Sequence, residues 1–361
     1  MIRLCMLAVA FVVTPSLVGA MELRGAAVDS TIIRNEFAVT SDPGVEIYVR
    51  EVVDPHRRDA QRGPVLLVHG ARVPGVASFD LQVPAGSLAV DLAAAGHTVY
   101  IMDARGYGRS TRPPQMDGPR QATGPLVRSD EVVRDIDAVV GAVRTRNNVE
   151  QVGLLGWATG GHWVGQYASL YSSKVSHLIL YNSLYGGTDG HPTLGRGSNN
   201  EDPQNPGQFN RAERGAYRLN TVASLFPSWD QSIPIDDKTQ WRDPAVAEAY
   251  GVAALASDPT SMMHDPPSFR APTGAIEDSF YLATGRQLWD ASLITAPTLI
   301  VRAERDFWSR PEDVQKLIEH LVSVPRLKIV TIPQATHFVH LDRAERGRSQ
   351  FIEEVQAFLA E

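Results

Sequence analysis

The chain has 361 residues, of which 43% are hydrophobic and 21% charged, the proportions of an ordinary globular protein that buries a substantial core. Its formal net charge is −7, and no basic run of any length is present, which argues against a nucleic-acid partner. The length allows one large domain or two.

The first twenty residues have the pattern of a secretory signal peptide. Arg3 supplies a positive charge, residues 4–13 form an apolar run, and residues 18–20 (Val-Gly-Ala) suit a cleavage site. The apolar run is too short for a stable transmembrane helix, and an uncleaved N-terminal anchor is the alternative. We therefore expect a secreted or periplasmic protein without stable membrane association after cleavage. Cys5, the only cysteine, lies in this segment, so the mature chain is expected to have no disulfide and no thiolate site.

From about residue 36, strands and helices alternate. Two strand-like runs surround a turn at 41–44, and short apolar runs such as 64–68 (PVLLV) are typical of buried parallel strands. The later expected strands are 98–102, 152–155, 177–181, 297–303 and 327–332, and the expected helices are 87–95, 128–146, 160–171, 244–256, 311–321 and 345–359. This alternation predicts an α/β fold, in which helices cover both faces of a mostly parallel sheet.

The alternation stops between residues 186 and 292, which are rich in Pro, Gly, Asn, Asp and aromatic residues. An insertion of this length between two strands is most simply a cap over the active site, where α/β proteins place their binding surfaces. The expected organisation is a signal peptide at 1–20, a first part of the core at 21–185, the cap at 186–292 and a second part of the core at 293–361.

Residues 156–160 (Gly-Trp-Ala-Thr-Gly) follow an expected strand and open an expected helix. This is the frame of a nucleophile elbow, Gly-x-Ser-x-Gly, except that Ala158 occupies the nucleophile position. The helix that follows offers backbone N–H groups to a developing oxyanion. The predicted oxyanion donors are the N–H of Thr159 and, from the loop after the strand at 64–68, the N–H of Ala71.

An acid and a histidine follow two later strands. Asp306 comes after the strand at 297–303 and His337 after the strand at 327–332, so a parallel sheet would bring both to the same edge as position 158. Glu304 competes with Asp306 as the acid, and His340 competes with His337 as the base. His69 is expected to hydrogen-bond within its loop rather than to transfer protons.

Together these residues resemble the α/β-hydrolase superfamily, in the branch that carries an inserted helical cap. The resemblance covers about residue 36 to the C-terminus and rests on His69-Gly70, Asp103-x-Arg105-Gly106-x-Gly108-x-Ser110, Gly156-x-Ala158-x-Gly160-Gly161, Asp306 and His337. It implies a doubly wound, mostly parallel sheet of the eight-stranded type and an esterase-like or amidase-like serine hydrolase that works through an acyl-enzyme. The departure from the family pattern is Ala158.

Two interpretations of Ala158 remain. Either the parent enzyme carries serine and this chain is its inactive serine-to-alanine variant, or the chain is a ligand-binding homologue that has lost its nucleophile. The first is favoured because the acid, the histidine and both oxyanion loops are retained. Nothing in the sequence indicates a metal or an organic cofactor, and the oligomeric state is open.

The expected partner is a small-molecule ester, with an amide or lactone as the alternative. Trp157 and Tyr185 are expected to contact it, and arginines 211, 214 and 218 could meet a substrate carboxylate, as in a half-ester. Two or three aromatic residues of the insertion should line the pocket, drawn from Tyr185, Phe209, Tyr217, Phe226, Trp229, Trp241, Phe269, Phe280 and Tyr281.

Overall fold

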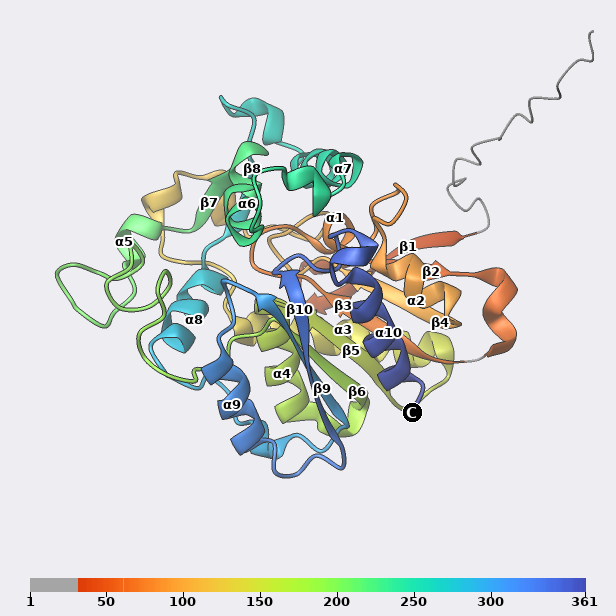
Figure 1. Ribbon diagram of the computed structural model, residues 1–361. Helices are drawn as coiled ribbons and strands as arrows, with labels where there is room; N and C mark the ends of the chain where they lie inside the picture. Colours follow the sequence, from red (N-terminus) through yellow and green to blue (C-terminus); the bar gives the residue numbers. More distant parts are fainter. Residues whose placement is uncertain (1–31, 61) are drawn as a thin grey trace, which may run out of the picture.

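The computed structural model describes residues 32–60 and 62–361, so the expected signal peptide at 1–20 lies outside the described residues. A sheet of eight strands runs through the molecule in the order β1-β2-β4-β3-β5-β6-β9-β10 (Figure 1). Its strands are β1 (Ile33–Asp42), β2 (Val45–Val53), β3 (Arg62–Val68), β4 (His97–Met102), β5 (Val152–Trp157), β6 (Val175–Tyr181), β9 (Thr298–Arg305) and β10 (Leu327–Thr336). β2 pairs antiparallel with both β1 and β4, and all other pairs are parallel.

Helices cover both faces of this sheet, as the alternating sequence predicts. The helices of the core are α1 (Gly75–Phe79), α2 (Leu88–Ala94), α3 (Ser129–Asn147), α4 (Thr159–Tyr171), α9 (Pro311–His320) and α10 (Arg348–Leu359). Because successive strand residues point to opposite faces, Leu66 and Val68 pack with α3 and α4, whereas Val65 and Leu67 pack with α1, α2 and α10. The predicted α/β fold with a doubly wound, mostly parallel eight-stranded sheet is confirmed.

The segment between β6 and β9 supplies the remaining elements. These are α5 (Arg211–Arg214), β7 (Tyr217–Asn220), α6 (Pro227–Ser232), α7 (Pro244–Ala256), β8 (Phe269–Pro272) and α8 (Gly274–Ala283). Figure 1 shows β7, β8, α6 and α7, in green to teal, grouped together on one side of the sheet. The sequence predicts a helical cap, but β7 and β8 form an antiparallel pair, so the segment contains strands as well as helices. The short runs Tyr217–Asn220 and Phe269–Pro272 are separated by about fifty residues, and no local turn signal links them.

None of the described helices is both long enough and apolar enough to cross a membrane.

Candidate active site

Position 158 lies at a sharp turn between β5 and α4. Ala158 has φ 54° and ψ −115°, a backbone conformation that L-residues other than glycine rarely adopt. The turn is held by its own hydrogen bonds: the N–H of Ala158 donates to the carbonyl oxygen of Tyr181 at 2.8 Å, and the N–H of Gly161 donates to that of Ala158 at 3.0 Å. This is the geometry of a nucleophile elbow, which presents the side chain at 158 on the tip of the turn.

The glycines around the elbow are required by the close approach of backbone to backbone. A Cβ on Gly156 would collide with the carbonyl group of Gly160, and a Cβ on Gly160 would collide with the carbonyl oxygens of Val68 and His69. Strand β5, the elbow and the loop after β3 can therefore meet only where side chains are absent.

Two segments that carry predicted oxyanion donors meet at the candidate nucleophile position. A Cβ built on Gly70 would lie 3.4 Å from the Cβ of Ala158, which places the loop after β3 directly against the elbow. Within residues 32–60 and 62–361, the N–H of Ala71 donates no hydrogen bond, while its carbonyl oxygen accepts from the Tyr107 hydroxyl and from Arg218, each at 3.0 Å. Thr159 is the first residue of α4, where backbone N–H groups have no partner inside the helix. Both N–H groups are thus available to an anionic oxygen.

His337 and Asp306 form a hydrogen-bonded pair beside the elbow. Nδ1 of His337 lies 2.5 Å from Oδ1 of Asp306, and both side chains are almost completely buried. The backbone N–H groups of Trp308 and Ser309 also donate to the Asp306 carboxylate, at 3.0 and 2.8 Å. These donors fix the carboxylate in place, and the carboxylate fixes the orientation of the imidazole.

Three further side chains anchor the backbone of His337, and two of them were not predicted from the sequence. Its carbonyl oxygen accepts hydrogen bonds from Trp157 Nε1 at 3.1 Å, from the Tyr181 hydroxyl at 3.0 Å and from Asn182 Nδ2 at 3.1 Å. Asn182 also accepts from the N–H of Ala303 at 2.8 Å, and so it joins β9 to the histidine loop. An asparagine directly after an expected strand, tolerant of the positive φ of 50° found here, is the signal that could have identified it.

Glu304 and His340, the alternatives to Asp306 and His337, do not form such a pair. Glu304 is exposed, and its carboxylate accepts from the backbone N–H of Gln334 at 2.6 Å. His340 is fully buried with Nδ1 3.0 Å from the Tyr181 hydroxyl, and burial holds its pKa well below the usual value. The geometry therefore selects Asp306 and His337 from the two pairs of alternatives.

His69 forms hydrogen bonds within and next to its loop, as the sequence predicts. Its Nε2 accepts from the N–H of Ala104 at 3.1 Å, and its Nδ1 lies 2.6 Å from the carbonyl oxygen of Gly70. Burial lowers the pKa of His69, which favours the neutral imidazole that this pair of bonds requires. His69 therefore braces the loop that carries the N–H of Ala71.

A pocket of about 310 Å³ brings most of the predicted site residues together between the core and the insertion. Among the predicted residues, Ala71, Trp157, Ala158, Thr159 and His337 line it, and Asp306 lies behind His337. The remaining lining residues are Gly70, Arg72, Val73, Thr193, Leu194, Arg218, Leu225, Ser228, Gln231, Tyr250, Phe307, Trp308 and Phe338.

The expected substrate contact of Tyr185 is not found. Its side chain is fully buried against Trp289, and its hydroxyl lies 2.9 Å from His320 Nδ1 and accepts from the N–H of Ala291 at 3.0 Å. None of the nine aromatic residues expected from the insertion lines the pocket either. Tyr250 of α7 takes that place, together with Phe307 and Trp308 from the loop after β9. Most of the nine are packed into the hydrophobic core clusters instead, because large aromatic side chains supply most of the buried area of a small subdomain.

Of the three arginines expected near a substrate carboxylate, only Arg218 lines the pocket. Arg211 forms an ion pair with Glu277 at 2.8 Å, and Arg214 donates to the backbone oxygen of Asn199. Arg72, which follows the predicted oxyanion donor Ala71, lines the pocket and was missed. Burial and the neighbouring Arg72 lower the pKa of Arg218 to about 10, and burial lowers the pKa of Arg72.

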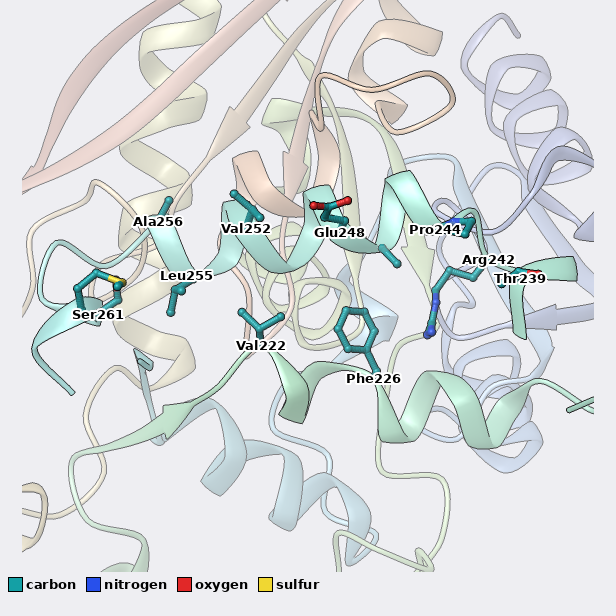
Figure 2. A pocket seen from close by; sticks show the side chains of 12 residues that line it. Val222, Phe226, Thr239, Arg242, Pro244, Glu248, Val252, Leu255, Ala256 and Ser261 are labelled. Atoms are coloured by element: carbon teal, nitrogen blue, oxygen red, sulfur yellow. The ribbon is translucent and has the colours of Figure 1, made fainter. Parts of the chain in front are cut away.

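A second hollow, of about 640 Å³, lies on the insertion itself (Figure 2). The side chains of α7 line one side of it, including Glu248 and Val252, while Val222 and Phe226 line the other. No histidine is among the described residues that line it, and of the residues expected at the site it contains only Phe226, one of the nine aromatic candidates. We therefore assign the candidate active site to the smaller pocket.

The described residues contain no cluster of three or more His, Cys, Asp or Glu side chains suited to a metal ion.

Comparison with known proteins identifies the family of the chain. The family described as "Serine aminopeptidase, S33" matches residues 59–344, which is most of the chain. The chain belongs to this family of α/β-hydrolases. The predicted resemblance to the α/β-hydrolase superfamily is thereby confirmed, and with it hydrolase membership.

Sequence relatives within this hydrolase group differ in what they act on. A proline iminopeptidase of Pestalotiopsis fici is 25% identical over 290 residues, which are 77% of this chain and 86% of that protein. An abhydrolase domain-containing protein of Caenorhabditis elegans is 31% identical over 117 residues, 32% of this chain. The (lyso)-N-acylphosphatidylethanolamine lipase of Homo sapiens is 30% identical over 128 residues, 36% of this chain. The matches span only 22% of the worm protein and 32% of the lipase.

Solved structures share the fold at low sequence identity. An E-2-(acetamidomethylene)succinate hydrolase matches with a TM-score of 0.56 and 17% identity, over 91% of this chain and 100% of that one. A meta-cleavage product hydrolase from Pseudomonas fluorescens matches with a TM-score of 0.55 and 17% identity, over 90% of this chain and 97% of that one. That structure is of a variant with a serine replaced by alanine, complexed with acetates.

Proposed function

We propose that this hydrolase, with serine at position 158, cleaves a carboxylic ester of a small, largely apolar substrate through an acyl-enzyme. The observation that carries the proposal is the His337–Asp306 pair at 2.5 Å, beside a pocket that also holds Ala158, Ala71 and Thr159. Leu225, Tyr250, Phe307 and Phe338 supply the apolar lining. The volume of about 310 Å³ suits a small molecule.

In the serine form, the hydroxyl oxygen at 158 attacks the ester carbonyl carbon while its proton passes to Nε2 of His337. The negative charge that develops on the carbonyl oxygen is accepted by the N–H groups of Ala71 and Thr159. The bond to the leaving alcohol then breaks, the proton on Nε2 moves to that alcohol, and the acyl group remains on the serine. A water molecule then attacks the acyl carbon while its proton passes to Nε2. The bond between the acyl carbon and the serine oxygen breaks, the proton on Nε2 returns to that oxygen, and the acid leaves. Asp306 stabilises the imidazolium in both halves.

In the chain as it stands, Ala158 carries no group that can attack. Loss of one member of a serine–histidine–acid system costs about 10⁴- to 10⁶-fold in rate, whereas oxyanion donors and substrate binding survive. We therefore propose that this chain is an inactive variant that still binds its substrate. Retention of the whole hydrogen-bonded pair and both oxyanion donors supports a serine parent over a ligand-binding homologue.

Peptide hydrolysis at a free amino terminus is the second candidate, favoured by the family description and by the proline iminopeptidase relative. An ammonium group in a small pocket needs a carboxylate partner, because a buried unpaired charge is costly. The described residues that line the pocket include no Asp or Glu and two arginines. We therefore place an ester before an N-terminal peptide.

The test is to restore the nucleophile with Ala158→Ser and to assay short aryl esters, with aminoacyl arylamides in parallel. We expect ester hydrolysis at least 10⁴-fold above that of the Ala158 chain. Ala158→Ser combined with His337→Ala is the control and should return the rate to that of the Ala158 chain. A restored serine without hydrolysis of any ester or amide would reject the proposal.

We propose further that the protein acts in the periplasm or outside the cell, on the basis of residues 1–20. N-terminal sequencing of exported protein should give a chain that starts after Ala20, and an intact Met1 would contradict cleavage.

A further inference from the structure

Two arginines that line the candidate pocket have no acidic partner. Arg72 comes from the loop after β3, and Arg218 comes from β7 in the insertion. Neither forms an ion pair with a carboxylate among residues 32–60 and 62–361, although each is half-buried. The charged side chains that act on Arg218 are those of Arg72 and Arg214, which repel it.

The arginines whose side chains are almost fully buried are neutralised by carboxylates. Arg50 pairs with Glu36 and Asp80, Arg105 with Asp42 and Asp135, and Arg270 with Asp117 and Asp258. In each of these pairs the closest nitrogen–oxygen distance is between 2.6 and 3.1 Å. The fold thus supplies a counter-ion where an arginine is almost fully buried. Arg72 and Arg218 are half-buried in the pocket without one, and a charge partly withdrawn from water without a partner is unfavourable.

The hydrogen bonds that these two arginines do make hold them in place without neutralising them. Nε of Arg72 donates to Asn220 Oδ1 at 3.0 Å, and its Nη2 donates to the carbonyl oxygen and the hydroxyl of Ser224 at 2.6 and 2.9 Å. Nη2 of Arg218 donates to the carbonyl oxygen of Ala71 at 3.0 Å. Nε of Arg218 is buried and has no partner among the described residues. Both arginines line the pocket, and Nε of Arg218 retains an unused hydrogen-bond donor.

We infer that Arg72 and Arg218 bind a carboxylate of the substrate, so that the ester cleaved is a half-ester of a small dicarboxylic acid. The guanidinium fork matches the two oxygens of a carboxylate in geometry and charge. Arg72 is adjacent to Ala71 in the chain and Arg218 contacts the Ala71 carbonyl oxygen, so a carboxylate bound by them would lie beside the loop whose N–H donates to the ester carbonyl oxygen in the proposed reaction. This inference rests on the proposed esterase function and narrows its substrate to an acid-bearing one.

A carboxylate bound by both arginines would also connect the core to the insertion. One belongs to the core and one to the insertion, so a carboxylate between them joins the two parts. A neutral ester of the same length would leave both charges uncompensated and would lose this link.

The kinetic test compares a matched pair of substrates in the Ala158→Ser background: the mono-aryl ester of glutaric acid and its neutral methyl ester. We expect kcat/KM to favour the acid-bearing ester by about 10- to 100-fold, the effect of one or two charge-assisted hydrogen bonds. Arg72→Met and Arg218→Met should each bring this ratio to within about threefold of unity, and Arg218→Lys should retain part of the preference. The ratio is informative because general damage to the fold lowers both rates equally.

Arg214→Met is the matched control. Arg214 precedes Arg218 by four residues, carries the same charge and does not line the pocket, so its removal should leave the ratio unchanged. A ratio near unity in the Ala158→Ser parent, or an equal fall of the ratio in Arg214→Met and Arg218→Met, would overturn the inference.

Binding to the chain with Ala158 in place separates failure of this inference from failure of the esterase proposal. Titration calorimetry with monomethyl glutarate and dimethyl glutarate needs no nucleophile, and we expect the acid-bearing ester to bind at least 10-fold more tightly. Equal binding of both, or equal binding of monomethyl glutarate and inorganic phosphate, would overturn a carboxylate site even if esters are hydrolysed. Preferred binding without hydrolysis after Ala158→Ser would leave the carboxylate site standing and reject the esterase.

Discussion

Asn182 is expected to be a positioning residue for the histidine, and its replacement should lower both stability and turnover. The side chain is fully buried after β6 and joins two segments. Its Nδ2 donates to the carbonyl oxygen of His337 at 3.1 Å, and its Oδ1 accepts from the N–H of Ala303 at 2.8 Å. Asn182→Ala removes both hydrogen bonds without touching the imidazole or the carboxylate of Asp306.

The cost of Asn182→Ala to the free energy of unfolding can be worked from these contacts. The N–H of Ala303 is left buried without its partner, which costs about 1–3 kcal/mol. The carbonyl of His337 keeps two other donors, so the loss there is about 1 kcal/mol. Alanine must also hold a φ of 50°, which costs about 1 kcal/mol more than asparagine. The sum is a destabilisation of about 3–5 kcal/mol.

The assay is ester hydrolysis in the Ala158→Ser background, together with urea unfolding. Displacement of a catalytic group by about 1 Å can cost 10²-fold, so we expect kcat to fall by about 10- to 100-fold while KM changes little. Asn182→Asp keeps an acceptor for Ala303 but places a buried carboxyl group against the carbonyl oxygen of His337, so it should lower kcat with a loss of stability at least as large as that of Asn182→Ala. Asn147→Ala, which removes a half-buried amide bonded at 2.8 Å to the Tyr100 hydroxyl far from the pocket, is the control. An unchanged kcat in both Asn182 variants would refute this role.

Further predictions concern the acid, the elbow and a buried carboxyl. In the Ala158→Ser background, Asp306→Asn should lower kcat by about 10⁴-fold, because the histidine loses its orientation, whereas Glu304→Gln should change it by less than threefold; equal losses would reject the assignment of the acid. Gly160→Ala should destabilise the fold by several kcal/mol, measured by urea unfolding, because its Cβ would meet a carbonyl oxygen of Val68. Burial raises the pKa of Asp342 from 3.8 to about 6, so the folded chain binds this proton more tightly than the unfolded chain does. Stability should therefore fall by about 3 kcal/mol as the pH rises from about 4 to about 6 and then level off, and Asp342→Asn should remove that component of the pH profile. A variant with the same slope would contradict this source of the pH dependence.

The parts of the fold that could be predicted from the sequence are those with strong local periodicity. The apolar run at 64–68 lies within β3, the amphipathic stretch at 128–146 becomes α3, and the stretch at 244–256 is α7 within its expected bounds. Helix α8 was missed because it is buried almost all round, and its polar residues Glu277, Asp278 and Ser279 are consecutive and do not mark an exposed face with the helical period. β7 and β8 were missed because each is only four residues long and its partner is distant.

In the candidate site, too, some residues could be predicted from the sequence and others could not. Asp306 and His337 could be placed at the same edge as position 158 because each follows a strand of one parallel sheet, and topology alone brings strand ends together. The lining of the pocket could not be predicted, since it depends on how the insertion folds over that edge. Arg72 lies next to a predicted oxyanion donor, yet only contacts with Asn220 and Ser224 of the insertion reveal where its guanidinium points.

The turn at position 158 suggests a use for this chain: capture of its own substrate. Its backbone conformation is set by β5, α4 and the surrounding glycines, and it places the methyl group of Ala158 at the tip of the turn. Under the proposed function, a ligand would bind there and stay chemically unaltered, because no nucleophile is present. Incubation with small-molecule extracts, followed by mass spectrometry of what is retained, would allow the protein itself to select the compound that its serine form consumes.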